Sequence, residues 1–348
     1  MSLLVLTGIP VGLAFGFALS RGRFCMNSAF RDIIVMKDYA LIKAVGVALL
    51  VAMIGFALMD LTGVIAINPK PLFWGANMLG GFVFGIGMVL AGGCASGITY
   101  RLGEGMVGAM SAVAGFAIVA VATAAGAFKP VVTFLQSSTK VTLADGGSPT
   151  LANVFGIPYY ALALGIAAVA IILWVIFAVR GRKAEKEEKA PLGTRIFKKG
   201  WGWTSTGIVI GIISIIAFPA SAAAGRNYPL GITGGWKTLL LSFETGQNSL
   251  TWESFLIIGT IVGACIAALI AGEFKLRAPA PKVIIQTFFG GALMGFGAIV
   301  SKGCNVGHIL SGVPQLSLGS ILGGAFIVLG CWFMAYWLFL RPMRKLGA

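Results

Sequence analysis

Nine separate runs of apolar residues constrain the fold of this chain more than any other feature of its sequence. A helix needs about 20 predominantly apolar residues to cross the hydrocarbon core of a bilayer. The whole chain is 58% hydrophobic and only 11% charged, which is typical of an integral membrane protein. The sequence therefore predicts an all-α membrane protein with about nine transmembrane helices. The runs lie near residues 3–19, 41–60, 74–91, 105–125, 159–179, 203–219, 253–271, 284–300 and 316–340.

A glycine pattern that ends in a cysteine occurs twice. The segment LGGFVFGIGMVLAGGCASG, residues 79–97, aligns without a gap with FGGALMGFGAIVSKGCNVG, residues 289–307. The glycines recur at the same spacing, and Cys94 aligns with Cys304. Each copy predicts a glycine-rich transmembrane helix that breaks at a cysteine and continues as a short broken or re-entrant helix. The chain thus divides into a first repeat at 1–179, a basic linker at 180–200 and a second repeat at 201–348.

The basic residues indicate how the chain is oriented. A net charge of +15 would suggest nucleic-acid binding in a soluble protein, but in a membrane protein the location of the charges decides their meaning. Many of them lie in 180–200, 275–282 and 341–348, which the positive-inside rule assigns to the cytoplasm. Counting spans from these segments puts the N-terminus outside and the C-terminus inside. The first apolar run lacks the features of a removable signal peptide, and we expect it to remain as a transmembrane helix.

The same count gives the helix before Cys94 and the helix before Cys304 opposite directions. The sequence therefore predicts two inverted, pseudo-symmetric repeats, and such folds place the substrate on broken helices near the middle of the bilayer. The halves are chemically unequal, because Ala224 or Gly225 stands roughly where the first half has Cys25.

Five cysteines without a CxxC pair predict neither a disulfide framework nor a tetrahedral metal site. Cys265 and Cys331 lie in apolar helices, where packing explains them. Packing would also explain a single Gly-Cys at the end of a glycine-rich helix. The duplication, and the polar residues that follow each copy, favour a path through the membrane instead. This makes Cys25, Cys94 and Cys304 the candidate path residues.

Positive charges beside these motifs point to an anionic substrate. Taken one by one, the same cations could instead reach out to lipid head groups. The proline-rich segment at 68–74 is assigned an interfacial, structural role. The residues expected to support the path by polarity or charge are Arg23, Asn27, Ser96, Arg101, Arg226, Lys302, Asn305 and His308.

Three segments, at 21–27, 80–105 and 295–320, resemble signature segments of the YeeE/YedE membrane family, and 224–235 resembles a fourth. The resemblance spans nearly the whole chain. It implies uptake of thiosulfate across the inner membrane of a prokaryote, with the substrate path on the three candidate cysteines. It further implies a separate cytoplasmic sulfur-handling partner of the TusA-like kind. We expect no cofactor and no enzymatic reaction.

A weak S–H donor can contact the soft terminal sulfur of thiosulfate and then release it, as transport requires. We expect protonated thiols in the apolar middle and cations at the two mouths, with Cys94 facing Cys304 and Cys25 as a station without a partner. Three alternatives stay open: transport of another sulfur or selenium compound, a passive anion channel, and a membrane thiol oxidoreductase. A thiol oxidoreductase would need a proximal cysteine pair such as CxxC. The sequence also shows no nucleotide-binding loop, so we do not expect this chain to hydrolyse ATP.

Overall fold

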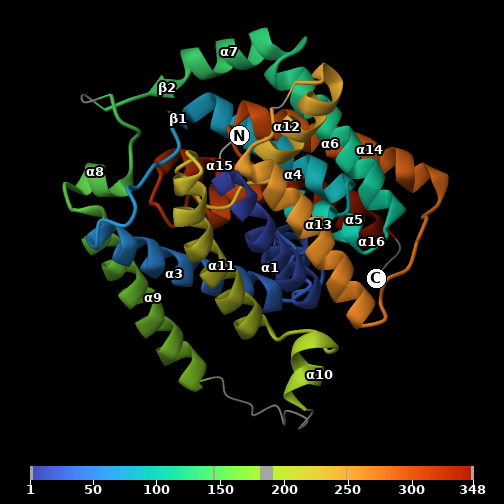
Figure 1. The fold of residues 1–348 in the computed structure, drawn as a ribbon, viewed down its shortest axis with the longest axis horizontal. Helices are drawn as coiled ribbons and strands as arrows, with labels where there is room; N and C mark the ends of the chain where they lie inside the picture. The colour runs from blue at the N-terminus through green and yellow to red at the C-terminus, as the bar shows by residue number, and fades with distance from the viewer. Residues whose placement is uncertain (1–2, 144–145, 181–190, 248, 346–348) are drawn as a thin grey trace.

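The computed structural model describes residues 3–143, 146–180, 191–247 and 249–345, and nearly all of its regular structure is helical (Figure 1). Within these ranges, nine helices are long and apolar enough to cross a membrane. The prediction of an all-α membrane protein with about nine spans is therefore confirmed. Residues 181–190 of the basic linker and 346–348 of the basic tail lie outside the described residues.

The first half combines long apolar helices with short segments between them. The long helices are α1 (Gly8–Arg21), which follows the 3-10 helix η1 (Leu3–Thr7), α3 (Ala40–Leu61), α4 (Trp74–Leu90), α6 (Val107–Ala124) and α9 (Tyr159–Arg180). The short helices are α2 (Met26–Val35), α5 (Ala95–Gly103), α7 (Lys129–Ser138) and α8 (Leu151–Phe155). The strands β1 (Leu72–Phe73) and β2 (Lys140–Val141) pair antiparallel, with Leu72 opposite Val141.

The second half follows a similar order. Its long helices are α11 (Trp203–Ala223), α13 (Trp252–Ile270), α14 (Pro281–Val300) and α15 (Leu318–Ala335). Its short segments are α10 (Leu192–Phe197), α12 (Thr233–Thr245), the π-helices η2 (Val306–Leu310) and η3 (Tyr336–Leu340), and α16 (Arg341–Lys345).

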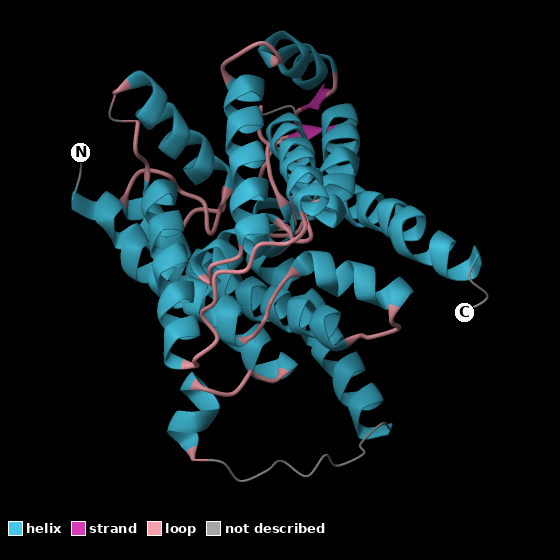
Figure 2. Cartoon of the chain, turned by 90° about the vertical axis from the view of Figure 1, so that its right-hand side faces the viewer, coloured by secondary structure: helices cyan, strands magenta, loops and turns pink. Residues whose placement is uncertain are grey.

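Both glycine-rich helices break just before their cysteine, as the sequence predicts. Helix α4 ends at Leu90 and α5 starts directly after Cys94, and the same interruption separates α14 from Cys304. Gly92 and Lys302 occupy the same place in the two breaks, and both adopt left-handed backbone, with φ of +70° and +58°. Loop segments run through the centre of the molecule between helices (Figure 2). The breaks therefore place irregular backbone inside the protein, where its polar groups are shielded from lipid.

Helices α4 and α14 cross through their glycines. A methyl group added at Gly80 would lie 2.7 Å from the Gly297 carbonyl oxygen. A methyl group added at Gly87 would lie 2.7 Å from the Gly290 carbonyl oxygen. Such distances are too short for any side chain, so the two backbones touch directly. The duplicated motif supplies the central helix crossing of the fold.

Other long helices also pair across the two halves. Helix α1 packs on α13 and α11 packs on α3, while α4 packs on α15 and α14 packs on α6. Helix α9 lies against α3 and exposes apolar side chains such as Val169 and Ile172. An apolar outer face of this kind suits contact with lipid tails.

Candidate functional site

Cys25 and Cys94 lie face to face in the middle of the protein. Each has extended backbone and immediately precedes a short helix, α2 and α5 respectively. Both side chains are buried, and their Sγ atoms lie 3.7 Å apart. Gly97 gives them room, because a methyl group there would lie 2.8 Å from Cys25 Sγ and 3.3 Å from Cys94 Sγ. The glycine three residues after the motif cysteine therefore has a direct role at this thiol pair.

Polar side chains connect the thiol pair to the second half of the chain. Ser96 Oγ lies 3.5 Å from Cys94 Sγ. Asn305 Oδ1 accepts a hydrogen bond of 3.3 Å from the Ala95 N–H, and Asn305 Nδ2 lies 3.3 Å from Met26 Sδ. Because Asn305 directly follows Cys304, a single amide ties the three cysteine motifs together.

The first turns of α2 and α5 converge on the thiol pair. The N-terminal end of a helix carries partial positive charge and free N–H groups, which favour an anion there. Two such ends meet at Cys25 and Cys94, and the Arg101 guanidinium lies nearby, 3.3 Å from where a methyl group on Gly93 would stand. The arrangement can hold an anion weakly, as a transport path requires.

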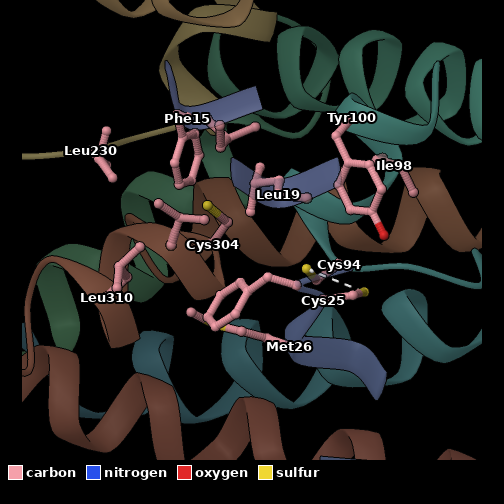
Figure 3. Close-up of a cluster of buried hydrophobic side chains, with 14 of the residues drawn as sticks. Phe15, Leu19, Cys25, Met26, Cys94, Ile98, Tyr100, Leu230, Cys304 and Leu310 are labelled. Carbon is pink, nitrogen blue, oxygen red and sulfur yellow. Dashed lines mark hydrogen bonds between the residues drawn. The ribbon is translucent and has the colours of Figure 1, made fainter. Parts of the chain in front are cut away.

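Cys304 lies apart from this pair, among Phe15, Leu19 and Leu310 (Figure 3). Its side chain is only 1% exposed, yet it forms part of the wall of a cavity of about 550 Å³. We call this the outer cavity, since it lies on the side predicted to face outward. Its charged lining residues are Lys70, Lys129, Arg226, Lys237, Glu253 and Lys302.

The charged residues of the outer cavity do not all attract an anion equally. Arg226 Nη2 forms a 2.7 Å ion pair with Glu253 Oε1, so these two charges largely cancel. Lys302 Nζ lies over the Phe73 ring, 5.4 Å from its centroid. The remaining lysines leave the cavity with a surplus of positive charge, which attracts anions.

A smaller cavity has a volume of about 320 Å³, and we call it the inner cavity because its wall includes Arg277 of the segment 275–282, which is predicted to face the cytoplasm. Its acidic residues are as many as its arginines: Asp32, Glu104 and Glu273 against Arg23, Arg101 and Arg277. An inner cavity with balanced charge attracts an anion less than the outer cavity does.

Glu273 connects the charges at this end of the protein. Its Oε2 lies 2.6 Å from Nη2 of Arg21, which is buried, and its Oε1 lies 3.4 Å from Nη2 of Arg23, which is exposed. The hydrogen bond from Arg21 holds the pKa of Glu273 below its usual value. Burial instead raises the pKa of Glu104, which accepts a 2.6 Å hydrogen bond from Ser20 Oγ.

Neither cavity wall includes Cys25 or Cys94. The three candidate cysteines belong to one cluster of buried side chains that also contains Phe15, Leu19 and Met26 (Figure 3). Cys25 and Cys94 therefore lie in the buried cluster rather than in the wall of either cavity.

The buried His308 and Asn27 have different surroundings. His308 Nε2 lies 2.9 Å from the Ser301 carbonyl oxygen, and its Nδ1 lies 3.4 Å from Ser320 Oγ, so this ring fastens the broken segment to α15. Asn27 Oδ1 lies 3.8 Å from Cys331 Sγ, whereas its Nδ2 has no hydrogen-bond partner among the described residues. Cys331, which the sequence assigned to packing, therefore has a polar neighbour.

Two further features differ from the sequence-based expectations. Cys25 was expected to lack a partner, but it forms the close pair with Cys94. Lys70 was not recognised, because its segment was assigned a structural role. The available signal was that Lys70 is the only charged residue between 61 and 73 and stands between two prolines. In the described ranges, no three His, Cys, Asp or Glu side chains are grouped so that they could hold a metal ion.

Comparison with known proteins identifies the family. The sequence model of the family described as sulphur transport matches residues 21–333. The chain is 42% identical to the thiosulfate transporter TsuA of Spirochaeta thermophila, over 97% of this chain and 100% of that protein. It is 31% identical to the thiosulfate transporter TsuA of Escherichia coli, over 98% and 97% of the two chains.

A shorter match reaches a more distant relative. The probable transporter YedE of Escherichia coli is 39% identical over 98 residues, which cover 28% of this chain and 23% of that protein. The match of the family model over most of the chain and the two nearly full-length similarities agree with the nine helices and the buried cysteine motifs. The chain therefore belongs to the sulphur transport family and is a membrane transport protein rather than an enzyme.

Proposed function

We propose that this protein takes up thiosulfate and passes it from the outer cavity to the inner cavity by way of Cys304 and the Cys25–Cys94 pair. The observation that carries the proposal is a basic cavity that has one buried thiol in its wall, with two more thiols beyond it in the same buried cluster. The two nearly full-length relatives are named thiosulfate transporters.

Thiols suit this substrate because thiosulfate has a soft terminal sulfur that bears much of its charge. A protonated thiol offers it a weak S–H hydrogen bond, whereas a thiolate would repel it. Weak contacts at successive stations allow the anion to move on, since a strong binding site in the centre would retain it.

We further propose that 1–179 and 201–348 form two inverted repeats joined by the linker at 180–200. The glycine contacts support this relation. Under the alignment of the two motifs, Gly80 corresponds to Gly290 and Gly87 to Gly297, so the contact of Gly80 with Gly297 becomes the contact of Gly290 with Gly87. A twofold relation between the halves accounts for both contacts at once.

The proposed direction is inward across a prokaryotic inner membrane, with the N-terminus outside and the C-terminus in the cytoplasm. The basic segments at 275–282 and 341–345 support this orientation. A separate TusA-like protein would then meet the anion at the inner cavity. Consumption of thiosulfate by such a partner would keep the flow inward.

The proposal is tested by uptake of radiolabelled thiosulfate into proteoliposomes that contain only this protein. Cys25→Ala, Cys94→Ala and Cys304→Ala should each lower the initial rate by about tenfold, the factor that corresponds to 1.4 kcal/mol. Cys265→Ala is the matched control, because Cys265 is half-buried on α13 and lines neither cavity. Equal rates for all four variants would reject a role of the thiols, and no uptake by the unaltered protein would reject the transport proposal.

Competition in the same vesicles separates thiosulfate from other substrates. Unlabelled sulfate lacks a soft sulfur atom and should compete poorly. Stronger competition by sulfite or a selenium oxyanion than by thiosulfate would favour one of the alternative substrates.

A further inference from the structure

The side chain of Lys70 lies directly over the break that contains Cys304. Its Nζ donates a 2.6 Å hydrogen bond to the Lys302 carbonyl oxygen, at the C-terminal end of α14. A methyl group added at Gly303 would overlap Lys70 Nζ, and one at Gly307 would lie 2.7 Å from it. These two glycines of the repeated motif therefore leave room for a cation beside Cys304.

Arg101 occupies the corresponding place in the other half. Its Nη1 donates a hydrogen bond to the carbonyl oxygen of Gly92, and Gly92 aligns with Lys302. In both motifs, the backbone carbonyl oxygen at this aligned position thus accepts a hydrogen bond from a basic side chain. The two cations come from unrelated positions, since the residue that aligns with Arg101 is Ser311. Lys70 therefore supplies, from another part of the chain, the cation that the second motif lacks at the position aligned with Arg101.

The loop that carries Lys70 is held firmly on the second half. Ser317 Oγ donates a 3.0 Å hydrogen bond to the Lys70 carbonyl oxygen, and the Asn68 N–H donates one of 3.1 Å to Gln315 Oε1. Prolines on both sides of Lys70 restrict its backbone. Lys70 Nζ also lies 5.2 Å from the centroid of the Tyr228 ring. The ammonium position is therefore fixed by the fold rather than left to a mobile side chain.

We propose that Lys70 is the substrate-binding cation of the outer site, where it contacts the oxygen atoms of the anion while the Cys304 thiol contacts its soft sulfur. This inference rests on the proposed function and deepens it. Arg226 is less suited to the role because Glu253 neutralises it. In the part of the chain that the structure describes, Lys70 forms no ion pair of that kind, and its hydrogen bond to a neutral carbonyl can be exchanged for one to an anion.

The outer and inner stations consequently differ in strength. The outer station combines the Lys70 ammonium with one thiol. The inner station combines two thiols and two helix ends with Arg101, whose charge is partly offset by the acidic residues of the inner cavity. We therefore expect a dianion to be held more strongly at the outer station than at the inner one.

The experiment compares Lys70→Met, which keeps the length but removes the charge, with Lys70→Arg and with the control Lys140→Met. Lys140 is an exposed lysine on β2 and lines neither the outer nor the inner cavity. In proteoliposomes, Lys70→Met should raise the KM for thiosulfate by about tenfold, since a close charge pair in a partly aqueous cavity is worth about 1–4 kcal/mol. The maximal rate should change less, Lys70→Arg should retain most of the affinity, and Lys140→Met should match the unaltered protein.

A second readout does not depend on transport. Cys304 is labelled in the purified full chain with a sulfonate-bearing and with a neutral methanethiosulfonate, and both rates are measured by peptide mass spectrometry. Lys70→Met should lower the ratio of anionic to neutral labelling by about tenfold, by the same electrostatic argument, while Lys140→Met should not. An unchanged ratio and an unchanged KM would overturn the role of Lys70. A changed ratio in a protein that takes up no thiosulfate would keep the anion site but reject the proposed substrate.

Discussion

Cys25 Sγ lies 3.7 Å from Cys94 Sγ, although the two residues are 69 positions apart in the chain. A disulfide bond is about 2.05 Å long, so modest side-chain rotation would bring the two sulfur atoms together. We predict that mild oxidation with diamide joins them and stops thiosulfate uptake, and that dithiothreitol restores it. Peptide mapping by mass spectrometry should find the cross-linked pair. Cys331→Ala should remain sensitive to diamide, and if Cys94→Ala were equally sensitive, another thiol would be responsible.

Gly97→Ala tests whether the spacing of this thiol pair matters. Alanine is favoured over glycine in a helix by about 1 kcal/mol, so local helix stability should not fall. The new methyl group would nevertheless lie 2.8 Å from Cys25 Sγ and push the thiol aside. We expect uptake to fall by about tenfold or more, with little change in the melting temperature. Gly165→Ala on α9, where an added methyl group meets nothing within 4 Å, should leave uptake unchanged.

Uptake should depend on pH through Lys70. Burial lowers the pKa of its amine to about 8, and the charges of Arg226 and Lys302 act in the same direction, whereas Glu253 opposes them. With that pKa, about nine-tenths of the amine is protonated at pH 7 and about one-tenth at pH 9. Affinity for thiosulfate should therefore fall as the pH rises through 8. Lys70→Arg should remove most of this fall, because arginine stays charged, and an identical profile in the variant would assign the titration elsewhere.

Glu273 should stabilise the fold through Arg21, whose side chain is 1% exposed. Glu273→Gln leaves a buried guanidinium without its counter-ion, and we expect a loss of about 1–3 kcal/mol, because the carboxylate itself is partly exposed. Since the pKa of Glu273 is lower in the folded protein than in the unfolded chain, its contribution is present above the unfolded pKa. The contribution is lost as the pH falls through the folded value.

Thermal unfolding in detergent measures this effect. The melting temperature of the Glu273→Gln variant should lie below that of the unaltered protein at pH 7, and the two should approach each other in acid. Glu244→Gln, at an exposed position on α12, serves as the control. A difference that persisted unchanged in acid would show that the carboxylate charge is not responsible.

The sequence was sufficient to predict the spans and the two breaks, because both follow from short-range patterns. Apolar length determines which segments cross a membrane, and the spacing of the glycines shows where two helix backbones touch. The three cysteine motifs were visible for the same reason. Periodicity and composition contain this information without any knowledge of tertiary contacts.

Pairings across the fold were not predictable from the same patterns. The sequence suggested Cys94 opposite Cys304, since repeats imply symmetry, yet the contact of 3.7 Å joins Cys94 to Cys25. Lys70 is 232 positions away in the chain from Lys302, whose carbonyl oxygen it binds, and no local sequence pattern predicts a contact between residues so far apart in sequence. His308 was expected to support the path, whereas its hydrogen bonds to Ser301 and Ser320 give it a place in the scaffold. These relations depend on how separate helices meet.

The buried cluster around the thiols also has an electrical consequence. Phe15, Leu19 and Met26 belong to the same buried cluster as the thiols, and Ser96 and Asn305 add polar groups beside them. A hydrated sodium ion would have to shed much of its water there, at a cost of several kcal/mol, and the positive ends of α2 and α5 would repel it. We therefore expect the protein to leak little sodium when it sits in an energised membrane.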